Sequence, residues 1–126
     1  MTTLIQRYAT PLAMPFSKAV RAGDFLFLSG VLPMDGEGRI VTGDIALQTR
    51  VVLERIAATL AEASASMGDL VRMTVWLADL GDFAAFSDEY RRHFAGSFPA
   101  RSMVEAMLYG GAGIEIEAQA LAPAAE

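Results

Sequence analysis

The chain has 126 residues, of which 53% are hydrophobic and 20% are charged. This length fits one domain, and the high hydrophobic content excludes an intrinsically disordered chain. The formal net charge is −5, whereas nucleic-acid-binding domains usually carry a basic patch, so we do not expect a nucleic-acid partner. We predict a single domain over residues 1–126. A domain of this size has too small an interior to bury all of its apolar side chains. We interpret the remaining apolar surface as surface that is buried between subunits.

The residue types narrow the chemistry further. There is no cysteine and only one histidine, His93, which excludes disulfides, thiolate nucleophiles and metal sites built from cysteines or several histidines. Lys18 is the only lysine and so the only candidate for a Schiff base. No apolar run approaches the roughly 20 residues of a membrane-spanning helix, and the first residues lack a signal-peptide pattern. We expect a cytoplasmic protein with no membrane partner.

The first half of the chain predicts a hairpin followed by a helix. Residues 1–14 are interpreted as an irregular segment, because Pro11 and Pro15 bracket a loop. Two strands over 17–21 and 25–29 flank a turn at 22–24 and predict a β-hairpin. The glycine-rich stretch 33–43 is an expected loop with a short extended piece at 39–41. Asp44 is the predicted N-cap of a helix that runs to about Ser66.

The second half alternates strands and a helix. Period-two hydrophobicity predicts strands over 71–77 and 114–121, and residues 100–108, which follow Pro99, are a further strand candidate. A turn at 79–82 precedes a helix whose apolar stripe is Phe83, Phe86, Tyr90 and Phe94, and Gly96 ends it. The glycines at 110–113 are interpreted as a hairpin turn, and residues 122–126 as a tail. This order predicts an α+β fold, a mixed β-sheet with two helices packed on one face.

Arg101 is the first candidate for chemistry. It follows Phe98-Pro99-Ala100, an apolar stretch in which a charge is costly unless it is paired. Its planar guanidinium suits bidentate binding of a carboxylate. That carboxylate belongs either to a ligand or to Glu105, four residues further along the same strand face, and the residue types alone favour Glu105.

Glu115 and Glu117 share one face of the last predicted strand. Two like charges on one face are typical of a solvent-facing side. One of them in a pocket would instead serve as an acid or base with a raised pKa, and the spacing leaves both interpretations open. His93 is interpreted as a solvated surface residue, because it lies beside Arg91 and Arg92.

Several separated motifs together resemble the Rid (RidA/YjgF) family of reactive-intermediate deaminases. The C-terminal signature is the most specific part, with the sequence FPARS at 98–102, VE at 104–105 and IEIEA at 114–118. Upstream, LSG at 28–30 before Pro33, QTR at 48–50, DLV at 69–71 and LGDF at 80–83 also match in order and spacing. The resemblance covers roughly residues 15–121.

This resemblance implies a chorismate-mutase-like (RidA-type) fold that assembles as a homotrimer. The sheets would form a central β-barrel with the helices outside and a pocket between each pair of subunits. The implied activity is that of a 2-iminobutanoate/2-iminopropanoate-type deaminase. Such a hydrolase acts on C=N bonds and converts 2-imino acids, formed from enamines such as 2-aminoacrylate, to 2-keto acids and ammonia. The family uses no metal or organic cofactor.

The resemblance also implies roles for individual residues. Arg101 would bind the substrate carboxylate, and Glu115 would position or activate the attacking water and carry protons to the departing ammonia. An imine carbon is already electrophilic when protonated, so such a reaction needs orientation and proton transfer more than a strong nucleophile. The residues implied to line the substrate pocket are Phe16, Ser29, Gly30, Ser87, Arg101 and Met103.

The chain departs from the family pattern at four pocket positions. Phe16 stands in place of the usual tyrosine, Val31 of a common glutamine, Ser87 of an asparagine and Met103 of a cysteine. These departures motivate an alternative, a non-catalytic trimer of the same fold that binds small carboxylate metabolites as a sensor or interaction protein. A third hypothesis, an RNA-cleaving translation inhibitor, is disfavoured by the net negative charge.

Overall fold

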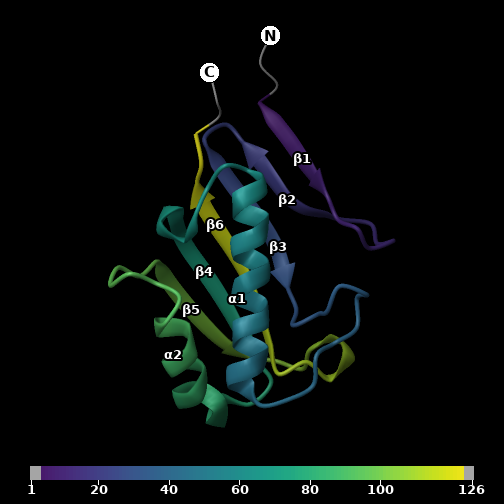
Figure 1. The fold of residues 1–126 in the computed structure, drawn as a ribbon, viewed down its shortest axis with the longest axis vertical. Helices are drawn as coiled ribbons and strands as arrows, with labels where there is room; N and C mark the ends of the chain where they lie inside the picture. The colour runs from purple at the N-terminus through teal and green to yellow at the C-terminus, as the bar shows by residue number, and fades with distance from the viewer. Residues whose placement is uncertain (1–3, 124–126) are drawn as a thin grey trace.

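A computed structural model describes residues 4–123. One mixed sheet has six strands in the order β1-β2-β3-β6-β4-β5, and both helices lie on the same face of it (Figure 1). The predicted α+β architecture, with two helices on one sheet face, is therefore confirmed. The strands are β1 (Ile5–Ala9), β2 (Ser17–Ala22), β3 (Phe25–Val31), β4 (Leu70–Leu77), β5 (Ala100–Glu105) and β6 (Ile114–Leu121), and the helices are α1 (Ile45–Glu62) and α2 (Phe83–Arg91).

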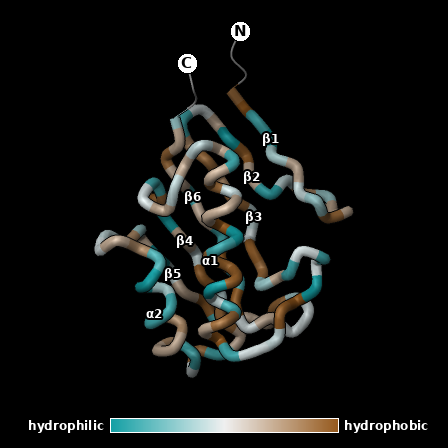
Figure 2. Tube along the Cα trace, in the orientation of Figure 1, coloured by the Kyte–Doolittle hydropathy of each residue, from teal (hydrophilic) through white to brown (hydrophobic). Residues whose placement is uncertain are grey.

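The core lies between the sheet and α1. Ile114 and Ile116 of β6 are fully buried, and so are Leu53, Ile56 and Leu60 of α1. The apolar residues of α1 recur at helical spacing, so they form one stripe that faces the sheet. Figure 2 shows this pattern as brown and teal stretches that alternate along α1. Side chains alternate between the faces of a strand, so the residues between the buried positions of β6 face away from the helices.

The helix α1 begins where the sequence predicts and ends earlier. The Asp44 side chain accepts a hydrogen bond from the backbone N–H of Leu47 at 2.9 Å, which confirms the N-cap. The predicted end at Ser66 is wrong, because the helix stops at Glu62. Ser64 has a φ of 61°, a left-handed conformation that a helix cannot continue.

The N-terminal segment is not irregular throughout. Ile5–Ala9 forms β1, which pairs antiparallel with β2 at the edge of the sheet. Only Tyr8 of this strand is partly buried, so the segment shows no hydrophobic alternation and its pairing depends on backbone hydrogen bonds. At the other end, Ala122 is buried and donates to the carbonyl of Asp24 at 2.8 Å. The remainder of the predicted tail, residues 124–126, lies outside the described residues.

The predicted hairpin at 22–24 is confirmed, whereas the one at 110–113 is wrong. β2 and β3 pair antiparallel. β5 instead pairs parallel with β4, and β6 lies on the other side of β4, between β4 and β3. The glycines therefore belong to a crossing connection that begins with a 3₁₀ turn over Tyr109–Gly111. The strand predicted to reach Leu108 ends at Glu105, and the extended piece at 39–41 makes only an isolated bridge from Ile40 to Met34.

The aromatic stripe of α2 is buried only in part. Phe86 and Tyr90 lie in the core, as predicted, but Phe83 at the start of the helix is 46% exposed. Phe94 lies beyond the last helical residue, and its ring centroid is 4.8 Å from that of Tyr90. The exposed ring of Phe83 borders one of the two cavities described next.

Candidate functional site

The first cavity, which we call the Glu115 cavity, lies where β3 runs past the start of β2. It has a volume of about 820 Å³, and its walls include the sequence-predicted residues Phe16, Ser29, Gly30 and Glu115. A β-bulge between Leu28 and Val31 adds a residue to β3 at this point. Bulges bend a strand and redirect its side chains, and here the bulge sets Gly30 against β6.

Glu115 is held directly against Gly30. A methyl group built on Gly30 would overlap the Oε2 atom of Glu115 and would lie 3.0 Å from its Cδ atom. A side chain at this position would therefore displace the Glu115 carboxyl group. Burial raises the pKa of the Glu115 carboxyl above its ordinary value, and the nearby carboxylate of Glu117 raises it further. A carboxyl group in such a setting accepts and returns a proton more readily than an ordinary surface carboxylate does.

Two other sequence-predicted residues, Phe16 and Ser29, also line the Glu115 cavity. The ring of Phe16 is 43% exposed and forms part of the wall. The Ser29 hydroxyl donates to the backbone carbonyl of Ser17 at 2.7 Å, so its proton joins β2 to β3. Its oxygen keeps lone pairs that can accept a further bond.

The second cavity, which we call the Arg101 pocket, lies between α2 and β5. It has a volume of about 330 Å³ and is lined by Ser87, Arg101 and the aromatic residues Phe83, Tyr90 and Phe98. The Arg101 guanidinium lies 5.0 Å from the ring centroid of Tyr90 and 5.7 Å from that of Phe83. Arginine over aromatic rings in this range is held by a cation–π interaction.

Arg101 has no carboxylate partner among residues 4–123. The ion pairs formed by these residues do not include Arg101. The predicted alternative, an ion pair with Glu105, is therefore wrong, because the Glu105 carboxylate accepts from the backbone N–H of Leu80 at 2.9 Å instead. The hydroxyl of Ser87 is also buried without a hydrogen-bond partner in this part of the chain. Both groups are left available to a ligand.

The sheet register places Arg101 and Glu115 on opposite faces. Arg101 lies in register with Met73, and Met103 with Val75. Met73 and Val75 are fully buried under the helices, so Arg101 and Met103 face the helices as well. Glu115 lies between Ile114 and Ile116, which are fully buried on the helix side, so it faces away from the helices. One chain therefore does not bring the two predicted catalytic residues together.

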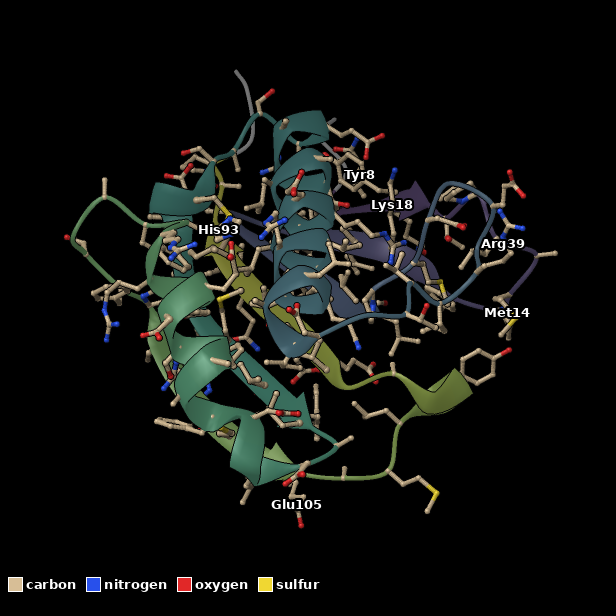
Figure 3. The ribbon with its side chains drawn as sticks, turned by 60° about the horizontal axis from the view of Figure 1, so that its bottom comes forward. Tyr8, Met14, Lys18, Arg39, His93 and Glu105 are labelled. Atoms are coloured by element: carbon tan, nitrogen blue, oxygen red, sulfur yellow. The ribbon has the colours of Figure 1, made fainter. Side chains whose placement is uncertain are left out.

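The sequence interpretation missed two groups of charged residues. Arg55 and Lys18 line the Glu115 cavity, and Lys18 forms an ion pair with Glu62. Figure 3 shows Lys18 on the cavity side of α1, together with Met14, and His93 on the other side. Charged residues on an amphipathic helix usually face solvent, so the sequence carried no signal for Arg55.

The second missed group surrounds Glu89, whose side chain is only 5% exposed. Its carboxylate lies 2.8 Å from Nε2 of His93 and 3.4 Å from the guanidinium of Arg50 on α1. The interpretation of His93 as a solvated residue is therefore wrong. Burial acts to raise the pKa of Glu89, but the hydrogen bonds with His93 and Arg50 outweigh it and keep the pKa below its ordinary value. The sequence predicts a helix that includes both residues, so the spacing of four between Glu89 and His93 could have revealed this pair.

The described residues contain neither a candidate metal site nor a candidate membrane-spanning helix. Between residues 4 and 123 there is no group of three or more histidine, aspartate or glutamate side chains placed to hold a metal ion. Over the same range no helix has the length and apolar character to cross a membrane.

Comparison with known proteins identifies relatives over almost the whole chain. Residues 7–122 match the family described as endoribonuclease L-PSP. A RutC family protein of Pyrococcus abyssi is 49% identical over 92 residues, which cover 72% of each chain. The 2-iminobutanoate/2-iminopropanoate deaminase of Capra hircus is 36% identical over 128 residues, covering 96% of this chain and 93% of the relative. The crystal structure of E. coli TdcF with bound serine superposes with a TM-score of 0.82 at 33% identity, covering 95% of this chain and 98% of the other.

Proposed function

Because the chain belongs to the endoribonuclease L-PSP family, also called the Rid family, we propose that it hydrolyses 2-imino acids to 2-keto acids and ammonia. One observation carries the proposal: the partly buried carboxyl group of Glu115, with its raised pKa, is held against Gly30 inside a cavity. The relationship to a 2-iminobutanoate/2-iminopropanoate deaminase supplies the reaction class.

In the proposed reaction, water adds to the imine carbon and the C–N bond then breaks. The Glu115 carboxylate accepts a proton from the attacking water while the new C–O bond forms, and the C=N π electrons move to nitrogen. The carboxyl group returns that proton to the nitrogen, and the carboxylate then accepts the proton of the new hydroxyl while the C=O bond forms and the nitrogen leaves as ammonia. Transfer of this second proton to the released ammonia restores the carboxylate, so a protonated imine and water give a keto acid and ammonium. One water is consumed and one ammonia released, so no oxidant, reductant or cofactor is needed.

The proposed role of Arg101 is to bind the substrate carboxylate. Its guanidinium has no carboxylate partner among residues 4–123 and opens onto the Arg101 pocket. A carboxylate held by two parallel N–H···O bonds has a fixed orientation. This fixes the position of the adjacent imine carbon, which is worth more to the rate than binding alone.

Since Arg101 and Glu115 face opposite sides of the sheet, we propose that the complete site forms between two copies of the chain. Arg101 of one copy would face Glu115 of its neighbour. The sheet face turned away from the helices is not covered by any helix (Figure 1). It carries exposed apolar side chains that include Phe25, Phe27, Val104 and Leu121, as an oligomer interface requires. A cyclic homotrimer, with one site at each interface, fits this head-to-tail arrangement.

A coupled assay tests the function. An amino-acid oxidase generates imino acids in solution, and semicarbazide traps those that remain, so an imine deaminase lowers the yield of trapped product. We expect the wild type to lower the yield and the Arg101→Ala variant to leave it unchanged, with the same oligomer size in both. Binding of 2-keto acids without any effect of the wild type on trapping would favour the non-catalytic alternative.

A further inference from the structure

The Glu115 cavity holds a second cation that the proposed reaction does not use. Arg55 projects from α1 and lines the same cavity as Glu115. Its Nη1 atom donates to the backbone carbonyl of Leu32 at 2.6 Å. A guanidinium has five N–H donors, so this bond leaves most of them free.

Arg55 has no carboxylate partner in the described part of the chain. The ion pairs among residues 4–123 leave it out. Glu62, the acidic residue of α1 that lines this cavity, is instead paired with Lys18. Arg55 is also partly buried, and burial lowers its pKa from the ordinary value. A partly desolvated guanidinium without a counter-ion gains more from binding an anion than an arginine on the open surface does.

Arg55 and Glu115 contact the same short segment of the chain. Arg55 is bonded to Leu32, and Glu115 lies against Gly30, two residues earlier in the same segment. The two contacted backbone positions are therefore at most about 7 Å apart. A similar distance, about 6–7 Å, separates the imine carbon of a five-carbon dicarboxylic acid from a nitrogen that donates to its far carboxylate.

We propose that Arg55 binds a second anionic group of the substrate, so that this chain prefers 2-imino dicarboxylic acids to imino acids with small uncharged side chains. This inference rests on the proposed function. The substrate would be held at both ends, with its 2-carboxylate on Arg101 of the neighbouring copy and its far carboxylate on Arg55. The pairing of Glu62 with Lys18 removes one source of repulsion from the cavity.

Binding of the product analogues tests this inference separately from catalysis. Titration calorimetry would compare 2-oxoglutarate, a dicarboxylate, with 2-oxobutanoate, a monocarboxylate, on the intact oligomer. We expect the wild type to bind 2-oxoglutarate more tightly. The Arg55→Gln variant should lose about tenfold or more in affinity for 2-oxoglutarate, as expected for one charge-assisted hydrogen bond, and less than about twofold for 2-oxobutanoate.

Control variants separate binding from a structural role. Arg55→Lys keeps the charge and should retain part of the preference for 2-oxoglutarate. Arg92→Gln makes the same charge change at an exposed position beside Glu89 and should alter neither affinity. Equal losses for both ligands in Arg55→Gln would mean that Arg55 only supports the Leu32 segment, and would overturn the inference. Equal binding of both ligands by the wild type, or binding of neither, would overturn it as well.

Failure of this inference can be distinguished from failure of the proposed deaminase function. Arg101→Ala should weaken both ligands alike, because both carry the carboxylate that Arg101 is proposed to bind. If the wild type shows the Arg55-dependent preference but no imine turnover, the inference about the ligand stands and the deaminase proposal fails.

Discussion

Replacement of Gly30 by alanine tests whether the position of Glu115 controls the rate. The new methyl group would overlap Oε2 of Glu115 and lie 3.0 Å from its Cδ atom. Carbon atoms pack at about 3.5–4.0 Å, so the Cδ atom would have to retreat by about 0.5–1 Å and the overlapping Oε2 atom by more. A misplacement of about 1 Å can cost roughly a hundredfold in rate. We therefore expect Gly30→Ala to lower kcat by about 10- to 100-fold.

The assay measures kcat and KM for imine hydrolysis, with thermal unfolding as the measure of stability. Gly36→Ala is the matched control, because nothing lies within 4 Å of the added methyl group there. If Gly30→Ala keeps the wild-type kcat, the carboxyl group held at Gly30 is not the proton carrier and the reasoning fails.

Three further predictions concern stability. The pKa of Glu115 is raised in the folded chain, so this carboxyl group lowers the stability of the fold as the pH rises from 4.5 through the raised pKa. Glu115→Gln should therefore be more stable than the wild type at neutral pH and should lose this advantage in acid. Equal stability of the two proteins at pH 7 would contradict this. Glu89→Ala removes the buried carboxylate that joins α2 to Arg50 of α1 and should lower the free energy of unfolding by about 1–3 kcal/mol, measured by urea denaturation. Asp44→Ala removes the N-cap of α1 and should cost about 1 kcal/mol in the same measurement, and a loss near zero would mean that the cap is not formed in solution.

Local signals in the sequence predicted the elements whose patterns are self-contained. The β2–β3 hairpin, the N-cap at Asp44 and the alternation in β6 each depend on neighbouring residues, and all three are confirmed. β1 was missed because its side chains are almost all exposed, so its sequence has no buried face to reveal. The position of β6 between β3 and β4 depends on pairing between distant segments, and no local pattern encodes it.

The same distinction applies to the candidate site. Residue types and motif order were enough to single out Arg101 and Glu115. Their placement on opposite faces could not be predicted, because it follows from the parallel register of β5 on β4, which sets Arg101 beside Met73. Arg55 was missed for a related reason: whether a charged residue of α1 faces solvent or a cavity depends on where the loop around Leu32 lies.

Complementation between two inactive variants tests the central claim most directly. Chains carrying Arg101→Ala and chains carrying Glu115→Ala would be co-expressed with different affinity tags, and the mixed oligomers purified and assayed for imine hydrolysis. Each variant alone should be inactive. If each site takes Arg101 from one copy and Glu115 from its neighbour, every mixed trimer has one complete site out of three, and activity should recover to about a third of the wild type. Mixed oligomers that stay folded but remain as inactive as the single variants would contradict a site shared between copies.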